Sequence, residues 1–188
     1  MRYDEIRKIE ELSEYILDKY DVKVPITNIE KLVEKMGGTV VYENLGREHN
    51  HIIKTGNKSF LIKIDNCYIQ KDNKNNDKIL KKMIADELGY LFLYMGYKTN
   101  SELWNSIPIN EKIKTDYEQL VAARVFGEAL LMPKEEFIEI IEKIKRKMKE
   151  LTYRLLLIIL KLILIQPKTE DRQLYVLKEY YNFIIKRR

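Results

Sequence analysis

Residues 83–94 read MIADELGYLFLY. Apolar side chains in and around this stretch recur at three- and four-residue spacing, which is typical of the buried side of an amphipathic helix. The pattern predicts a helix over 78–95 that ends at Gly96. Because Asp86 and Tyr90 are four residues apart, they share one face of that helix, with Glu87 beside them. The predicted buried side consists of Ile79, Met83, Ile84, Leu88, Leu91 and Phe92.

A second long helix is predicted over 113–132, after a connecting segment that contains Trp104. It ends before Pro133, because proline cannot donate a backbone hydrogen bond and disfavours helical backbone in the residue before it. The end of this helix belongs to the stretch 122–137, which reads AARVFGEALLMPKEEF. These two helices are the longest regular elements that the middle of the chain predicts.

The beginning of the chain predicts two further helices. Apolar residues at helical spacing indicate an amphipathic helix over 3–20 and a shorter one over 29–36. Thr27 or Asn28 is the candidate N-terminal cap of the shorter helix. The glycine pair that starts at Gly37 ends it, since glycine adopts the left-handed backbone of a helix C-terminus without strain.

Between the helical regions the apolar period shortens to that of strands. The runs predict three or four short strands of a small antiparallel sheet, and they lie at 40–42, 51–53, 60–64 and 67–69. Cys67, the single cysteine, is interpreted as a small core residue of the last strand. His49 and His51 lie on the same side of a strand, and we interpret them as residues of a surface hairpin, with a pair of metal ligands as the alternative.

Composition indicates a folded, helix-rich globular protein. The chain has 188 residues, 45% of them hydrophobic and 34% charged, which is enough apolar material for one domain and a small appendage. Acidic and basic side chains alternate in the first residues, a pattern unlike that of a signal peptide. We therefore expect a cytoplasmic protein with no membrane partner. The net charge of +5 bears on solubility and encounter rates and does not define a site.

Three of these stretches resemble the ImmA/IrrE family of metallopeptidases. Residues 83–94 are similar to the family helix FTIAHELGHLLLH, and residues 122–137 are similar to its second motif, EANRFAAELLMPKEEF. Residues 24–38, VPITNIEKLVEKMGG, resemble the start of such domains. The resemblance covers about residues 5–140 and implies an α+β fold, with a small antiparallel sheet packed against the helices of a zincin-like domain.

The resemblance also implies which functional residues have changed. In a helical H-E-x-x-H motif both histidines bind zinc, and the glutamate is the general base for the metal-bound water. Asp86 and Tyr90 stand at the two histidine positions, and Ala122 stands at the third ligand position. Glu87 keeps the general-base position. We therefore expect no metal, no cofactor and no peptidase activity, and we expect Tyr90 and Tyr94 to fill the emptied pocket.

The function that follows from the resemblance is that of a pseudopeptidase. Active relatives are implied to cleave helix-turn-helix repressors and to be common in prophages and other mobile elements. A member without zinc can keep the surface that binds a protein partner. The expected partner is such a repressor or, in a phage setting, a host defence component that the protein inhibits.

Two alternatives stay open. The first is a hydrolase with a rebuilt metal site of Asp86, Glu87 and Glu118, an oxygen-rich set that suits Mg, Ca or Mn better than Zn. The second is nucleic-acid binding through a basic segment, although no recognised DNA-binding motif accompanies it. That segment consists of Lys143, Lys145, Arg146, Lys147 and Lys149.

The last part of the chain predicts a helical subdomain over 141–188, packed on a peptidase-like domain of residues 1–140. Its strongest feature is the apolar run 151–165, which is too short to span a bilayer. We favour burial of this run against a final helix over 171–186, with a contact between identical subunits as the alternative.

Overall fold

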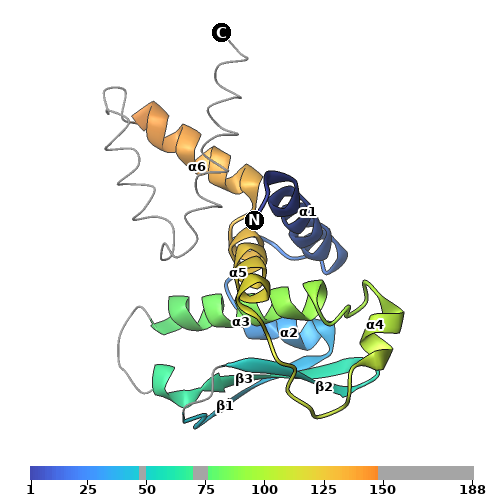
Figure 1. The fold of residues 1–188 in the computed structure, drawn as a ribbon. Helices are drawn as coiled ribbons and strands as arrows, with labels where there is room; N and C mark the ends of the chain where they lie inside the picture. The colour runs from blue at the N-terminus through green and yellow to red at the C-terminus, as the bar shows by residue number, and fades with distance from the viewer. Residues whose placement is uncertain (47–49, 70–75, 148–188) are drawn as a thin grey trace.

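The computed structural model describes residues 1–46, 50–69 and 76–147. They form a mixed α+β arrangement of a small sheet and six α-helices (Figure 1). The expected α+β class is confirmed at this level. Most of the proposed 141–188 subdomain, including the runs 151–165 and 171–186, lies outside the described residues.

The sheet contains three strands in the order β1-β3-β2. The strands are β1 (Gly38–Glu43), β2 (His51–Gly56) and β3 (Ser59–Asp65). β2 and β3 form an antiparallel hairpin, but β1 pairs parallel to β3, with Val40 opposite Ile62. The prediction of a wholly antiparallel sheet was therefore wrong. The physical reason is that the chain enters β2, at the far edge of the sheet, beside the end of β3, where the Asn50 side chain accepts a hydrogen bond from Asp65 N.

Of the three or four strands that the sequence predicts, the one at 67–69 does not form. Residues Asn66–Tyr68 form a short 3-10 helix, η1, because the Asp65 side chain accepts a hydrogen bond from Cys67 N at 2.8 Å and turns the chain. Cys67 is exposed and is not a core residue.

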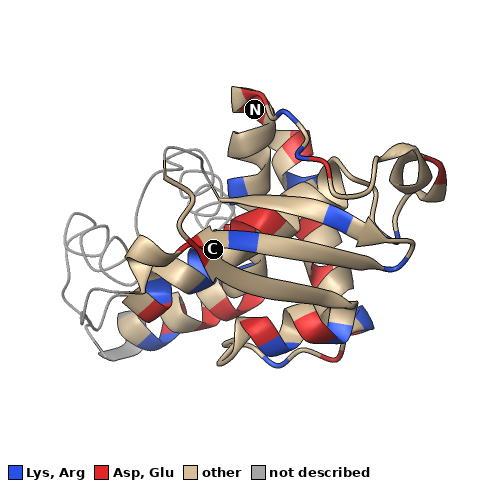
Figure 2. Cartoon of the chain, turned by 90° about the horizontal axis from the view of Figure 1, so that it is seen from below, with Lys and Arg blue, Asp and Glu red and all other residues tan. Residues whose placement is uncertain are grey.

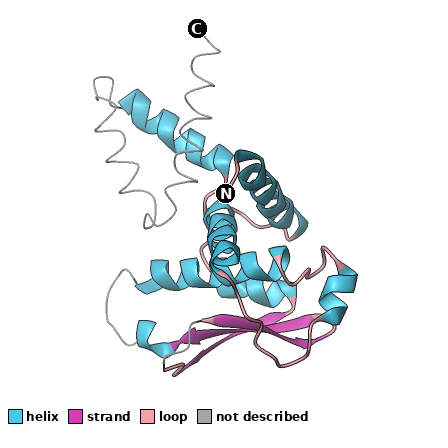
Figure 3. Ribbon diagram, viewed as in Figure 1, coloured by secondary structure: helices cyan, strands magenta, loops and turns pink. Residues whose placement is uncertain are grey.

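The helices form layers on one face of the sheet (Figure 3). Next to the strands lie α2 (Ile29–Met36) and α3 (Asn76–Leu93), and α5 (Tyr117–Leu131) packs across α3 with α1 (Tyr3–Lys19) beside it. Viewed from below, the strands lie in front, and helices cover the face of the sheet behind them (Figure 2). The inner face of β3 is fully buried through Phe60, Ile62 and Ile64, so the core lies between the sheet and the helical layers.

Local capping sets the ends of these helices. The Asn28 side chain accepts a hydrogen bond from Lys31 N, and Gly37 adopts φ +97° just after α2, as the sequence predicts. Asp116 and Gln119 form a reciprocal capping box, so α5 begins at Tyr117, four residues later than predicted.

Two helices complete the described fold. α4 (Ser101–Ser106) occupies the segment predicted only as a connection, and Asn100 caps it. Its Trp104 is 5% exposed and donates a hydrogen bond from Nε1 to Asn57 O at 2.7 Å, which joins α4 to the β2–β3 turn. α6 (Lys134–Lys147) begins directly after Pro133 and extends into the region from residue 141 that the sequence predicts to be helical.

Candidate functional site

The candidate site lies where α3 crosses α5. A Cβ atom added to Gly89 would lie 2.3 Å from Ala123 O, and one added to Gly127 would lie 2.5 Å from Asp86 Oδ1. The backbones therefore approach as closely as glycine allows. Gly89 and Gly127 hold Asp86, Glu87 and Tyr90 of α3 in a fixed position against α5.

Asp86 belongs to a partly buried charged cluster at this crossing. Lys82 Nζ lies 3.5 Å from Asp86 Oδ1 and 3.4 Å from Glu128 Oε1 of α5. Asp86 Oδ1 is buried, and 3.5 Å is too long for a well-formed hydrogen bond. Burial raises the pKa of Asp86 to about 7, with Glu128 adding to the rise and Lys82 opposing it. Lys82 and, more weakly, Arg124 are therefore positive charges that act on this carboxylate.

Glu87 is partly buried on the neighbouring face of α3. Burial, and then the charge of Asp86, raises the pKa of Glu87 to about 8, and Lys112 opposes the rise. The described residues give its carboxyl group no hydrogen bond or ion pair. Near neutral pH the group is therefore mostly protonated, and in that form it can donate a hydrogen bond.

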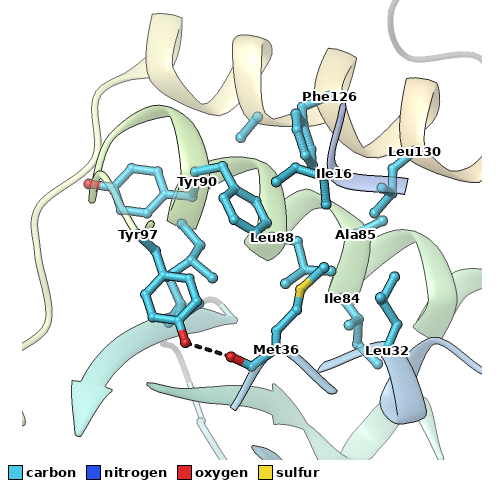
Figure 4. Packing of buried hydrophobic residues seen from close by; sticks show 14 of the residues in the cluster. Ile16, Leu32, Met36, Ile84, Ala85, Leu88, Tyr90, Tyr97, Phe126 and Leu130 are labelled. Carbon is cyan, nitrogen blue, oxygen red and sulfur yellow. Dashed lines mark hydrogen bonds between the residues drawn. The ribbon is translucent and has the colours of Figure 1, made fainter. Parts of the chain in front are cut away.

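Tyr90 and Tyr94 pack together on the face of α3 that the sequence assigns to them. Tyr90 is 6% exposed, and its ring centroid lies 5.5 Å from that of Tyr94. The Tyr90 ring points away from Leu88 and the rest of the labelled cluster (Figure 4). Burial raises the pKa of Tyr90 to about 12, and the charges of Glu87 and Asp116 add to the rise. The expectation that the Tyr90 ring is buried is confirmed.

The structure does not bring all the residues of the expected sites together. Ala122 is 6% exposed and offers no ligand atom. Glu118 is exposed near the start of α5, nine residues before the Gly127 that contacts Asp86. At 1.5 Å per residue this separation is about 13 Å along the helix axis. Asp86 and Glu118 therefore do not share one ion site, and the geometry gives the rebuilt metal site no support.

The donor set does not fit the zinc ion that the family resemblance implies. Zinc binding needs three or four nitrogen, sulfur or carboxylate donor atoms directed at one common position. Within the described ranges, no group of three or more His, Cys, Asp or Glu side chains is arranged to hold a metal ion. The three implied ligand positions are occupied by the Asp86 carboxylate, which faces Lys82, by the buried phenol of Tyr90 and by the methyl group of Ala122. No chemical step through a metal is derived for this site.

The other candidate residues lie elsewhere or outside the described residues. His49 is outside them, whereas His51 begins β2. Lys143 is exposed on α6 and pairs with Glu139 at 2.7 Å. Residues 145–147 end that helix, and Lys149 lies outside the described residues.

Sequence reasoning missed two features of the site. Lys82 is four residues before Asp86, so helical spacing alone was a usable signal for the ion pair. Glu128 approaches from another helix, 42 residues away from Asp86 in the chain, and no local pattern indicates it.

The described residues thus define an α+β domain with a polar, partly buried helix crossing. No protein-family model, curated protein or solved structure matches the chain. In the part of the chain that the structure describes, no helix is long and apolar enough to cross a membrane.

Proposed function

We propose that the protein is a catalytically inactive pseudopeptidase of the ImmA/IrrE type, which acts by binding a protein partner. The resemblance of residues 83–94 and 122–137 to the family motifs supports the assignment. It assigns Asp86, Tyr90 and Ala122 to the zinc-ligand positions and Glu87 to the general-base position.

The observation that supports the proposal is which protein groups stand at and beside the positions that the resemblance assigns to zinc ligands. The Lys82 ammonium lies between Asp86 and Glu128, at 3.5 and 3.4 Å, and Tyr90 and Ala122 are buried. Amide hydrolysis needs an activated nucleophile and stabilisation of the oxyanion, and in a zinc peptidase the metal supplies both. Glu87 alone supplies neither. Its raised pKa also keeps it mostly protonated near neutral pH.

Partner binding is the activity that survives loss of the metal. The partner that the resemblance implies is a helix-turn-helix repressor or, in a phage setting, a component of a host defence system. Binding without turnover acts by occupancy, so its effect depends on the affinity for the partner and on the concentration of the protein.

Capture from the host tests this proposal. The tagged full-length chain is crosslinked in its host, and proteins bound to it are identified and sized by mass spectrometry. We expect one specific partner, recovered at full length after prolonged incubation. The Glu87→Gln variant serves as the matched control and is expected to leave the partner equally intact. No specific partner, or fragments of the partner that disappear with Glu87→Gln, would overturn the proposal.

A further inference from the structure

The strand β1 forms an open edge of the sheet. The strand order β1-β3-β2 places β1 at one edge and β2 at the other (Figure 1). β1 pairs with β3 over its whole length, Gly38–Glu43, and this pairing uses the backbone groups on one side of the strand. Among the described residues, no hydrogen bond reaches the backbone groups on its other side. This row of donors and acceptors is a template for one further strand.

The edge formed by β2 differs, because another segment occupies part of it. Asn110 N donates a hydrogen bond to Lys54 O at 2.8 Å, and Lys54 Nζ holds the end of α4 through Trp104 O. β1 also lacks the features that protect natural sheet edges, since it contains no proline and no lysine and pairs with β3 in a continuous register. Of the two edges, β1 is therefore the one that can accept a strand.

The sheet divides the side chains of β1 between two faces. Val40 lies opposite the buried Ile62 of β3, and both Val40 and Tyr42 pack against the core, so these two belong to the inner face. The remaining side chains point to the outer face and are those of Thr39, Val41 and Glu43. A further strand at this edge must match both rows.

β1 is complementary to itself about Val41. In an antiparallel pair related by a two-fold axis, residues opposite each other lie on the same face of the sheet. Placing Val41 opposite Val41 of a second copy sets Val40 opposite Tyr42 and Thr39 opposite Glu43. Pairs of β-branched and aromatic side chains are favourable, and the Thr39 hydroxyl can donate to the Glu43 carboxylate. Glu43 is the one charged residue of β1, so no like charges face each other in this register.

We propose that β1 pairs antiparallel with β1 of a second copy of the chain, so that two three-stranded sheets become one continuous sheet. The occupant is a second copy because β1 matches itself in charge and in side-chain order, and because a two-fold contact removes both open edges at once. One strand from each copy is a small interface, so the dimer is expected to dissociate in the micromolar range. The inference goes beyond the proposed function and does not depend on it.

Sedimentation equilibrium of the full chain, from about 1 to about 200 μM, tests the proposal. In Val41→Lys and in Val41→Glu a charge faces its own copy across the axis, so each variant is expected to dimerise at least about tenfold more weakly than the parent. An equimolar mixture of the two is expected to regain the parent affinity, because lysine then faces glutamate. Thr55→Lys, exposed on β2, is the control and is expected to dimerise like the parent. Circular dichroism verifies that each variant is folded.

Several results would overturn the proposal. A parent that stays monomeric at the highest concentration would show that a second copy does not occupy β1. A dimer that persists unchanged in Val41→Lys and Val41→Glu would place the contact on another surface. Equal weakening by Thr55→Lys, or a mixture of the two Val41 variants that stays monomeric, would contradict the two-fold register. None of these results decides whether a host partner is captured, so the proposed function is tested separately.

Discussion

Lys82 lies one helical turn before Asp86, and its ammonium nitrogen is 3.5 Å from Asp86 Oδ1. Asp86 stands at a position where the family resemblance implies a metal-bound side chain. The same nitrogen is 3.4 Å from Glu128 Oε1, so one lysine faces carboxylates from both crossing helices. A fixed ammonium group neutralises charge but cannot bind and activate water as a metal does. This relationship connects the structure of the site with its proposed loss of activity.

Tyr90→Ala is expected to destabilise the protein by about 3 kcal/mol, because it leaves a cavity beside Tyr94. Tyr90→Phe keeps the ring and is expected to change stability little, since the hydroxyl has no described hydrogen-bond partner. Urea unfolding followed by far-UV circular dichroism measures both. Tyr117→Ala is the exposed control, expected within about 0.5 kcal/mol of the parent. Equal losses of stability in Tyr90→Ala and Tyr117→Ala would contradict the buried position of the Tyr90 ring.

Gly89→Ala is expected to lower the free energy of unfolding by about 1–3 kcal/mol, since the new Cβ would lie 2.3 Å from Ala123 O. The usual effect of this exchange inside a helix has the opposite sign, a gain of about 0.5–1 kcal/mol. Thermal unfolding decides between the two signs. A variant more stable than the parent would show that α3 and α5 are not in close contact at Gly89.

The raised pKa of Glu87 predicts how stability depends on pH. The folded state holds the proton up to a pKa of about 8, whereas the usual value is 4.5, so the folded state binds more protons between these values. The contribution of Glu87 to stability is therefore full at low pH and falls as pH rises from about 4.5 to about 8. Asp86, with a pKa of about 7, contributes in the same direction.

Glu87→Gln removes this titration. Relative to the parent, the variant is expected to gain stability as pH rises from 5 to 8, which chemical denaturation at several pH values measures. Glu102→Gln, at an exposed position on α4, provides the control and is expected to show no such trend. If the difference between Glu87→Gln and the parent does not change with pH, the Glu87 carboxyl is not protonated in the folded state.

Lys54→Met is expected to cost about 2 kcal/mol, because it removes two charged hydrogen bonds. Lys54 is 3% exposed, and its Nζ donates to Trp104 O at 2.8 Å and Ile107 O at 3.1 Å, at the end of α4. Trp104 is the single tryptophan, so its fluorescence reports on the docking of α4. Lys58→Met, exposed on the same hairpin, is the control. An unchanged emission spectrum in Lys54→Met would contradict this role.

Local chemistry was sufficient to predict most of the helices. Asn28 and Gly37 delimit α2 by capping, and Pro133 separates α5 from α6, because these residues act on the backbone next to them. The predicted start of α5 was wrong. The side chain that fixes this start, Asp116, lies in a stretch with few apolar residues, where apolar spacing does not mark the beginning of a helix.

Long-range contacts could not be predicted in the same way. The parallel pairing of β1 with β3 depends on which edge of the sheet β2 occupies, and strand periodicity carries no information about strand order. The burial of Lys54 depends on carbonyl groups about fifty residues away. In the site, the face shared by Asp86 and Tyr90 followed from spacing, whereas the approach of Glu128 did not.

The metal content of the purified full-length chain tests the central claim most directly. Elemental analysis after dialysis is expected to find zinc and other transition metals far below one equivalent per chain, with no difference between the parent and Asp86→Ala. A stoichiometric metal in the parent that disappears in Asp86→Ala would contradict the claim that Lys82, Tyr90 and Ala122 have replaced a metal site.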